Sequence, residues 1–147
     1  MNLSIRRLAK SDAGLARVAE ELNSKDWYEG VQDFTADSLK KFLSDPDNFY
    51  IAAEVEGKVV GGLHGYVLLH PDGRKLVYID EVDTIKGHRR QGVATAMMQE
   101  AFELSKERGA SEAWLGTEHD NEPAKALYQK LGPSEIDEGP IYTYKVN

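Results

Sequence analysis

The segment Lys86-Gly87-His88-Arg89-Arg90-Gln91-Gly92-Val93-Ala94 joins an apolar strand pattern to a long helical pattern. A helix N-terminus leaves backbone N–H groups without intrahelical partners, and such groups bind anions. Gly92 has no side chain to keep a phosphate away from the backbone, and Ala94 is small enough to leave the next turn accessible. Arg89 and Arg90 can add charge-assisted hydrogen bonds to phosphate oxygens. The segment therefore predicts a phosphate-binding turn.

The residues before this turn predict two helices and an antiparallel arrangement of strands. Stretches rich in β-branched and aromatic residues, separated by turn sequences, are typical of a meander. The predicted strands are Leu3 to Leu8, Asn48 to Val55, Val59 to His70 and Lys75 to Thr84. One predicted helix is capped by Ser11, and the other is opened by Thr35 and stopped by Asp45-Pro46. The polar segment Ser24 to Phe34 between these helices is a candidate wall of a substrate site.

The residues from the turn onward alternate between helix and strand. The predicted elements are a helix from Gly92 to Arg108, a strand from Ser111 to Gly116, a helix capped by Asp120 or Asn121 and ended by Gly132, and closing strands at Ile136 and Ile141 to Val146. The whole order predicts a single α/β domain over residues 1–147, with a mixed central sheet flanked by about four helices.

Two motifs in this order resemble a known family. Arg89-Arg90-Gln91-Gly92-Val93-Ala94 matches the pattern [Q/R]-x-x-G-x-[G/A]. Further along, Asn121-Glu122-Pro123-Ala124-Lys125-Ala126-Leu127-Tyr128-Gln129-Lys130-Leu131-Gly132 resembles N-x-x-A-x-x-L-Y-x-K-x-G. Both patterns are those of the GNAT superfamily of N-acetyltransferases, and the two stretches look most similar to aminoglycoside 3-N-acetyltransferases. Pro133 and Lys86 depart from the family pattern, which leaves the path of the final strands open.

The resemblance implies acetyl-CoA as co-substrate. It implies donor-binding roles for Val82, Asp83, Thr84, Arg89, Arg90, Gln91, Gly92, Val93, Ala94, Thr95, Asn121, Ala124 and Tyr128. It also implies that the Tyr128 hydroxyl lies near the sulfur of the donor. A phenol with a pKa of about 10 can protonate a departing thiolate of similar basicity, so Tyr128 is the candidate general acid. The alternative is a core aromatic residue with a satisfied hydroxyl.

Three acidic residues end the strand before the turn. Asp80, Glu81 and Asp83 follow an apolar run, and burying carboxylates there needs a reason. An amine must lose a proton to attack a thioester, so a carboxylate beside the acetyl group is useful. Glu81 is the leading candidate base or amine anchor and Asp83 the second, and the choice between them stays open. In a regular strand Glu81 and Asp83 would share one face and Asp80 would point to the other, but the β-bulge that the resemblance implies here would alter the count, so the faces stay open. Alternatively, the acids only keep the sheet edge soluble.

Composition limits the remaining functions. The chain has 147 residues, no cysteine and a net charge of −7, which disfavours a general nucleic-acid or anionic-membrane surface. The N-terminal residues do not resemble a signal peptide, and no apolar run reaches the roughly 18 residues of a membrane span. A cytoplasmic protein is expected. The histidines His64, His70, His88 and His119 show no metal-ligand spacing, so no metal is predicted.

The acceptor is expected to be a primary amine of a small polycation, first an aminoglycoside, which would make the protein an antibiotic-resistance enzyme. Polyamines, amino-acid derivatives and protein lysine or N-terminal amines are alternatives. A non-catalytic acyl-CoA-binding module is a different class, and a nucleic-acid role for the basic run Lys86 to Arg90 is a third. The sequence leaves open whether the protein is a monomer or a homodimer.

Overall fold

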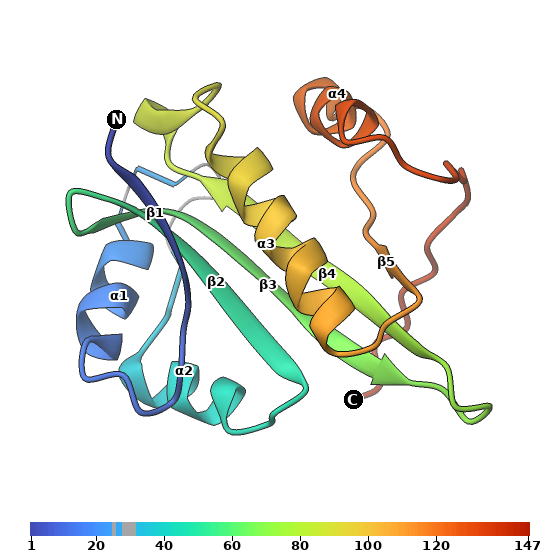
Figure 1. Cartoon of the computed structure of the whole chain (residues 1–147), viewed down its shortest axis with the longest axis horizontal. Coiled ribbons are helices and arrows are strands. Elements are labelled where there is room, and N and C mark those ends of the chain that lie inside the picture. The colour runs from blue at the N-terminus through green and yellow to red at the C-terminus, as the bar shows by residue number, and fades with distance from the viewer. Residues whose placement is uncertain (25, 28–31) are drawn as a thin grey trace. The chain divides into compact units, whose positions relative to one another are not determined.

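The computed structural model describes residues 1–24, 26, 27 and 32–147. They form two units, Met1–Gly116 and Thr117–Asn147, and each is described on its own. The first unit holds a sheet of five strands in the order β1-β2-β3-β4-β5 (Figure 1). Its elements are β1 (Leu3–Arg7), α1 (Leu15–Leu22), α2 (Ala36–Leu43), β2 (Asn48–Val55), β3 (Lys58–Leu69), β4 (Lys75–Thr84), the short 3-10 helix η1 (Lys86–His88), α3 (Val93–Glu107) and β5 (Glu112–Trp114). The second unit holds α4 (Glu122–Lys130). No helix of the described chain is both long and apolar enough to cross a membrane.

The sheet is mixed, as the sequence predicts. Strands β1 to β4 pair antiparallel with their neighbours, whereas β5 runs parallel to β4. The predicted meander is confirmed, and β2 and β3 are joined by Glu56 and Gly57, which have φ values of 51° and 78°. Two positive φ values suit the twist of a two-residue hairpin turn. This fold confirms the predicted α/β class.

Helices cover both faces of the sheet (Figure 1). On one face α3 lies so close to β3 that a Cβ on Gly61 would be 2.9 Å from Val93 Cγ1. On the other face, α1 and α2 form an apolar cluster with β2. The buried members of this cluster are Leu8, Leu15, Val18, Ala19, Leu22, Trp27, Leu39, Tyr50, Ala52 and Val59. Three members of this cluster, Leu22, Trp27 and Tyr50, also line the candidate site described below.

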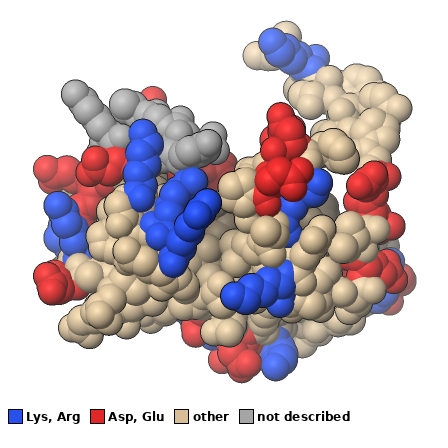
Figure 2. Space-filling model, turned by 90° about the horizontal axis from the view of Figure 1, so that it is seen from above, with Lys and Arg blue, Asp and Glu red and all other residues tan. Residues whose placement is uncertain are grey.

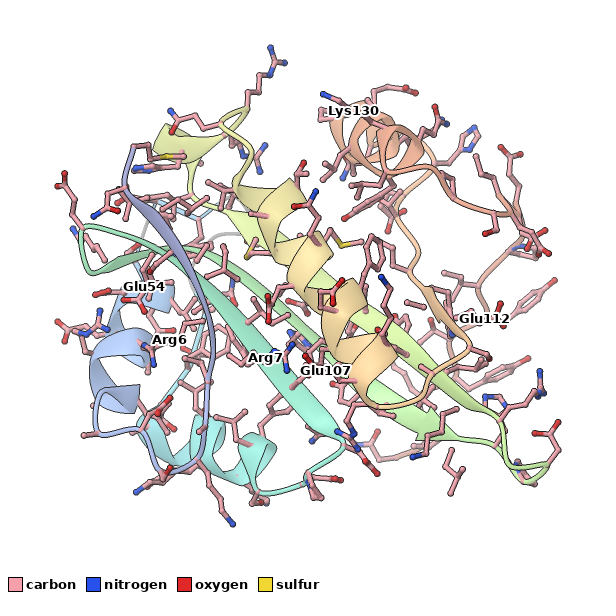
Figure 3. All side chains as sticks on the ribbon, viewed as in Figure 1. Arg6, Arg7, Glu54, Glu107, Glu112 and Lys130 are labelled. Carbon is pink, nitrogen blue, oxygen red and sulfur yellow. The ribbon has the colours of Figure 1, made fainter. Side chains whose placement is uncertain are left out.

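Two adjacent arginines of β1 form ion pairs on opposite sides of the sheet, Arg6 on the side of α1 and Arg7 on the side of α3 (Figure 3). Arg6 Nε donates to the buried Glu54 of β2 at 2.7 Å, and Arg17 of α1 donates to the other oxygen of Glu54 at 3.2 Å. Arg7 Nη1 donates to Glu107 of α3 at 2.6 Å, and this bond lowers the pKa of Glu107. A buried carboxylate with two guanidinium partners is satisfied. The exposed Arg7 pair adds less because water screens it.

One residue of β4 is extra in its pairing with β3. His64 lies opposite Glu81 and Gly65 lies opposite Ile79, so Asp80 has no partner residue and forms a β-bulge. At Gly65 the backbones of β3 and β4 approach closely. A Cβ on Gly65 would collide with the carbonyl oxygen of Tyr78 and lie 2.7 Å from Phe49 Cζ. The bulge therefore depends on a position without a side chain.

Replacing Gly65 by alanine is expected to destabilise the protein by roughly 1–3 kcal/mol, because the added methyl group meets rigid backbone. Urea unfolding measures the change. Gly116→Ala is the control, since a Cβ there meets nothing within 4 Å. A Gly65→Ala protein as stable as the Gly116→Ala protein would contradict this account of the bulge.

Three local predictions need correction. Ser11 does not cap α1, because Asp12 closes a turn onto the Ala9 N–H and the helix begins later, with Gly14 as N-cap. The strand predicted from Ser111 to Gly116 is shorter, and β5 covers only Glu112–Trp114. The closing strands are not formed: residues 133–147 contain no strand, and their apolar side chains are exposed. Proline, glycine and acidic residues fill the stretch 133–140 and do not favour a strand.

Candidate functional site

A small hollow with a cavity volume of about 10 Å³ lies between α1, β2, β3 and the end of β4. Aromatic side chains and two carboxylates share its wall. The described lining residues are Leu22, Trp27, Gln32, Phe34, Tyr50, Gly62, His64, Glu81 and Asp83. The predicted substrate-wall segment, Ser24 to Phe34, contributes three of these residues, while its residues 25 and 28–31 lie outside the described part of the chain.

The three acidic residues at the end of β4 lie on one face of the sheet. Glu81 and Asp83 alternate along the strand and share one face, as a regular strand predicts, and both line the hollow. Asp80 does not point to the opposite face, because the bulge turns it back. Its carboxylate accepts hydrogen bonds from the Tyr66 and Tyr78 hydroxyls at 3.4 and 3.3 Å.

The Tyr50 phenol closes the inner end of the hollow. Tyr50 is buried, and its pKa is raised by that burial and by the nearby charges of Glu81 and Asp83. Its ring reaches over Gly62, where a Cβ would collide with the Tyr50 hydroxyl. The hydroxyl therefore stays protonated and offers a donor to a bound group.

The predicted phosphate-binding turn has the backbone that its sequence requires. Arg90 has a φ of 60° and Gly92 a φ of 82°, both in the left-handed region. Gly92 is the N-cap of α3, and no side chain of the described residues caps this helix. A Cβ on Gly92 would meet nothing within 4 Å, so the space beside it is open. Figure 2 looks onto the end of the molecule where η1 and α3 begin and shows Lys and Arg side chains gathered there.

Beside this turn, β4 runs on past its pairing with β5. The ladder joins only Leu76, Val77 and Tyr78 to β5, so in the described chain the backbone from Ile79 to Thr84 has no strand on that side. The Thr84 N–H donates to Asp83 Oδ1 at 2.9 Å and is occupied in this state. An unpaired strand edge can receive an extended ligand through main-chain hydrogen bonds.

The second unit carries the other motif on α4. Asn121 caps this helix by accepting a hydrogen bond from the Ala124 N–H at 3.2 Å. Ala124 and Tyr128 are four residues apart and share a face of the helix. Tyr128 is half-buried, and burial raises its pKa. The capping role gives Asn121 a structural function in addition to the predicted contact with the donor.

His64, Asp80 and Glu81 are the one group of side chains in the described residues that could hold a metal ion, with ligand atoms within 4.8 Å of one another. His64 Nε2 lies 3.3 Å from Asp80 Oδ2. The bulge creates this proximity, which sequence spacing does not reveal. The predicted lack of a metal therefore remains a prediction.

Comparison with known proteins assigns the chain to a family. The model of the acetyltransferase (GNAT) family matches residues 16–132. The chain belongs to this family. The GNAT match covers both the β4–α3 turn and α4, the two places where the sequence motifs lie.

Individual GNAT proteins resemble the chain in sequence or in fold. N-alpha-acetyltransferase 30 of Schizosaccharomyces pombe is 44% identical over 70 residues, which are 48% of this chain and 45% of that protein. An aminoglycoside acetyltransferase from an uncultured soil metagenomic sample is 27% identical, with a TM-score of 0.80 over 98% of this chain and 100% of that one. Another such enzyme, in complex with sisomicin, is 22% identical, with a TM-score of 0.84 over 99% and 97% of the two chains, and shares the fold. The chain spans about half the length of the curated relatives it matches.

Sequence reasoning missed part of this site. Tyr50, Gly62 and His64 line the hollow, yet they lie on strands whose alternation alone does not tell which face is open. The pairing of β2 with β3 was predictable from the hairpin turn. The turn alone does not give the register, because a shift between Ala53 and Glu54 places Tyr50 opposite His64, whereas counting outward from Glu56-Gly57 would place it opposite Leu63.

Proposed function

We propose that residues 1–147 form a single acetyl-CoA-dependent N-acetyltransferase domain that acts on a primary amine of a small polycation, first an aminoglycoside at its 3-amine. One observation carries this proposal. Glu81 and Asp83 stand together in an aromatic hollow at the end of β4, immediately before the phosphate-binding turn. A cytoplasmic location is part of the same proposal.

Acetyl-CoA, the acetyl donor, is proposed to bind at the turn before α3 and at α4. The N–H groups at the start of α3 suit the pyrophosphate of acetyl-CoA, with Arg89 and Arg90 adding charge. The proposed donor contacts are Val82, Asp83, Thr84, Arg89, Arg90, Gln91, Gly92, Val93, Ala94, Thr95, Asn121, Ala124 and Tyr128. Backbone N–H groups at the unpaired edge of β4 would polarise the thioester carbonyl.

The chemistry needs two proton transfers. The acceptor nitrogen attacks the thioester carbonyl carbon, and Glu81 or Asp83 takes the proton that this nitrogen loses. The carbon–sulfur bond then breaks, and the Tyr128 hydroxyl gives its proton to the departing thiolate. Burial keeps the Tyr128 pKa above its ordinary value, so the hydroxyl is protonated and ready to donate at neutral pH.

Charge and shape favour a polycation as acceptor. One carboxylate of the Glu81 and Asp83 pair can hold a neighbouring ammonium while the other serves the reacting nitrogen. The half-buried ring of Phe34 in the wall can stabilise a cation or a sugar ring through its face. The similarity to aminoglycoside acetyltransferases supports the same acceptor class.

A second candidate acceptor is the N-terminal amine of a peptide. The support is the 44% identity to N-alpha-acetyltransferase 30 over 70 residues. The unpaired edge of β4 would suit an extended peptide as well as it suits the extended arm of acetyl-CoA. Acceptor competition between sisomicin and a short peptide distinguishes the two.

Replacing either carboxylate of the hollow is expected to impair turnover. Glu81→Gln and Asp83→Asn should each raise KM for sisomicin, lower kcat, or both, with kcat/KM falling by about tenfold or more. Raising the salt concentration should weaken sisomicin binding by screening. Steady-state kinetics at low and high salt measure both effects.

Asp72→Asn is the matched control, because Asp72 is an exposed carboxylate in the β3–β4 turn and pairs with Arg74. Its kinetics should equal those of the parent. Unchanged kinetics in both Glu81→Gln and Asp83→Asn would remove these residues from the proposed mechanism.

A further inference from the structure

A row of aromatic side chains runs from the hollow across the sheet to its β5 edge. Tyr50 stacks on His64 with ring centroids 6.0 Å apart, and His64 meets the edge of Tyr66 at 6.0 Å. Tyr66 stacks on Tyr78 at 6.4 Å, and Tyr78 contacts Trp114 at 4.4 Å. Successive members come from β2, β3, β4 and β5, so the row crosses four neighbouring strands on one face.

The row opens steadily toward solvent. Tyr50 is 5% exposed at the closed end of the hollow, and Trp114 is 49% exposed at the far end. Tyr66 and Tyr78, between them, are half-buried. We call Tyr66, Tyr78 and Trp114 the aromatic strip. Cross-strand ring contacts stabilise a sheet, but that role does not require the indole of Trp114 to be half exposed to solvent.

A carboxylate lies against the strip. The hydroxyls of Tyr66 and Tyr78 both donate to Asp80, which the bulge has turned onto this face. His64, which lines the hollow, contacts the same carboxylate at 3.3 Å. Negative charge therefore accompanies the rings from the hollow outward. Aromatic faces beside an oriented carboxylate bind ammonium groups and sugar rings.

We propose that the aromatic strip, with Asp80, is a second acceptor subsite that binds a remote amino-sugar ring of a multi-ring acceptor. The inference rests on the proposed function, because it presumes that the reacting amine lies by Glu81 and Asp83. An acceptor of several linked rings would then reach along the row, with its reacting amine at the mouth of the hollow beside Glu81 and Asp83 and its next ring against Tyr78 and Trp114. The strip therefore sets a preference for long acceptors over short ones.

The test compares sisomicin with 2-deoxystreptamine, a single ring that carries the same reacting amine. In Trp114→Ala, the dissociation constant and KM for sisomicin should rise roughly tenfold, whereas those for 2-deoxystreptamine should stay within about twofold. Calorimetry supplies the dissociation constants without turnover. Trp114→Phe keeps a ring and should retain most of the sisomicin affinity.

Leu69→Ala is the matched control. Leu69 is 68% exposed near the end of β3, where alternation directs it to the opposite face, so it should change neither acceptor. Equal losses for sisomicin and 2-deoxystreptamine in Trp114→Ala, or no loss for either, would overturn the subsite. Sisomicin binding that depends on Trp114 without acetyl transfer would overturn the proposed acceptor and keep the subsite. No sisomicin binding by the parent protein would overturn both.

Discussion

Gly92→Asp is expected to lose acetyl-CoA binding by at least about 100-fold, the loss that two charge-assisted hydrogen bonds would account for. The new carboxylate would stand beside the open N-terminus of α3, where a phosphate is proposed to lie. Like charges at this distance repel, and the added side chain also fills the space. Isothermal titration calorimetry with acetyl-CoA measures the change.

Comparing Gly92→Asn with Gly92→Asp separates the effect of the negative charge on acetyl-CoA binding from any effect of the added side chain on folding. Aspartate and asparagine have nearly the same size, and both tolerate a positive φ better than other non-glycine residues, so any backbone strain at φ 82° is shared by the two variants. Each should therefore leave α3 intact, and circular dichroism checks this. We expect Gly92→Asn to weaken binding less than Gly92→Asp. Parent-like affinity in a folded Gly92→Asp protein would show that phosphate does not bind at this turn.

Tyr128→Phe is expected to lower kcat by roughly 10²- to 10⁴-fold while changing acetyl-CoA affinity little, because the lost hydroxyl acts when the thiolate departs. Burial raises the Tyr128 pKa, so the protonated, donating form persists at every pH below that raised value. The parent rate should therefore show no loss from this group between neutral pH and its ordinary pKa. Pre-steady-state kinetics isolate the chemical step.

Tyr142→Phe is the control for this variant, because Tyr142 is an exposed phenol of the same unit, and removing its hydroxyl should leave kcat unchanged. A Tyr128→Phe protein whose chemical step stays within about twofold of the parent would identify a different proton donor, or departure of an unprotonated thiolate.

Much of the fold was predictable because its patterns are local. The bounds of β2 and β4 agree with the predicted ones, since turn residues mark their ends. Thr35 caps α2, as its position before an apolar helical pattern predicts, and its hydroxyl accepts a hydrogen bond from the Ser38 N–H. The turn before α3 was also predictable from a single residue, Gly92. Few residues other than glycine tolerate its φ of 82°.

Features that depend on pairing between distant strands were not predictable. The bulge at Asp80 arises from the register of β3 with β4; the residues of a single strand contain no sign of it, and only the family resemblance implied a bulge here. The bulge decides which face Asp80 occupies, and with it the contact to His64 and the aromatic strip. The alternation from Ile141 to Val146 indicates a potential strand, but residues 133–147 form none and pair with no strand of the described sheet.

Release of free CoA is the most direct measurement of the proposed activity. The chain contains no cysteine, so a thiol reagent detects only the CoA that turnover releases. The panel contains sisomicin, spermidine, a free amino acid, an N-terminal peptide and a sample without acceptor. We predict the fastest thiol release with sisomicin, together with one added acetyl group on it by mass spectrometry. Release only with the peptide or with uncharged amines, or no release with any acceptor, would contradict the proposal.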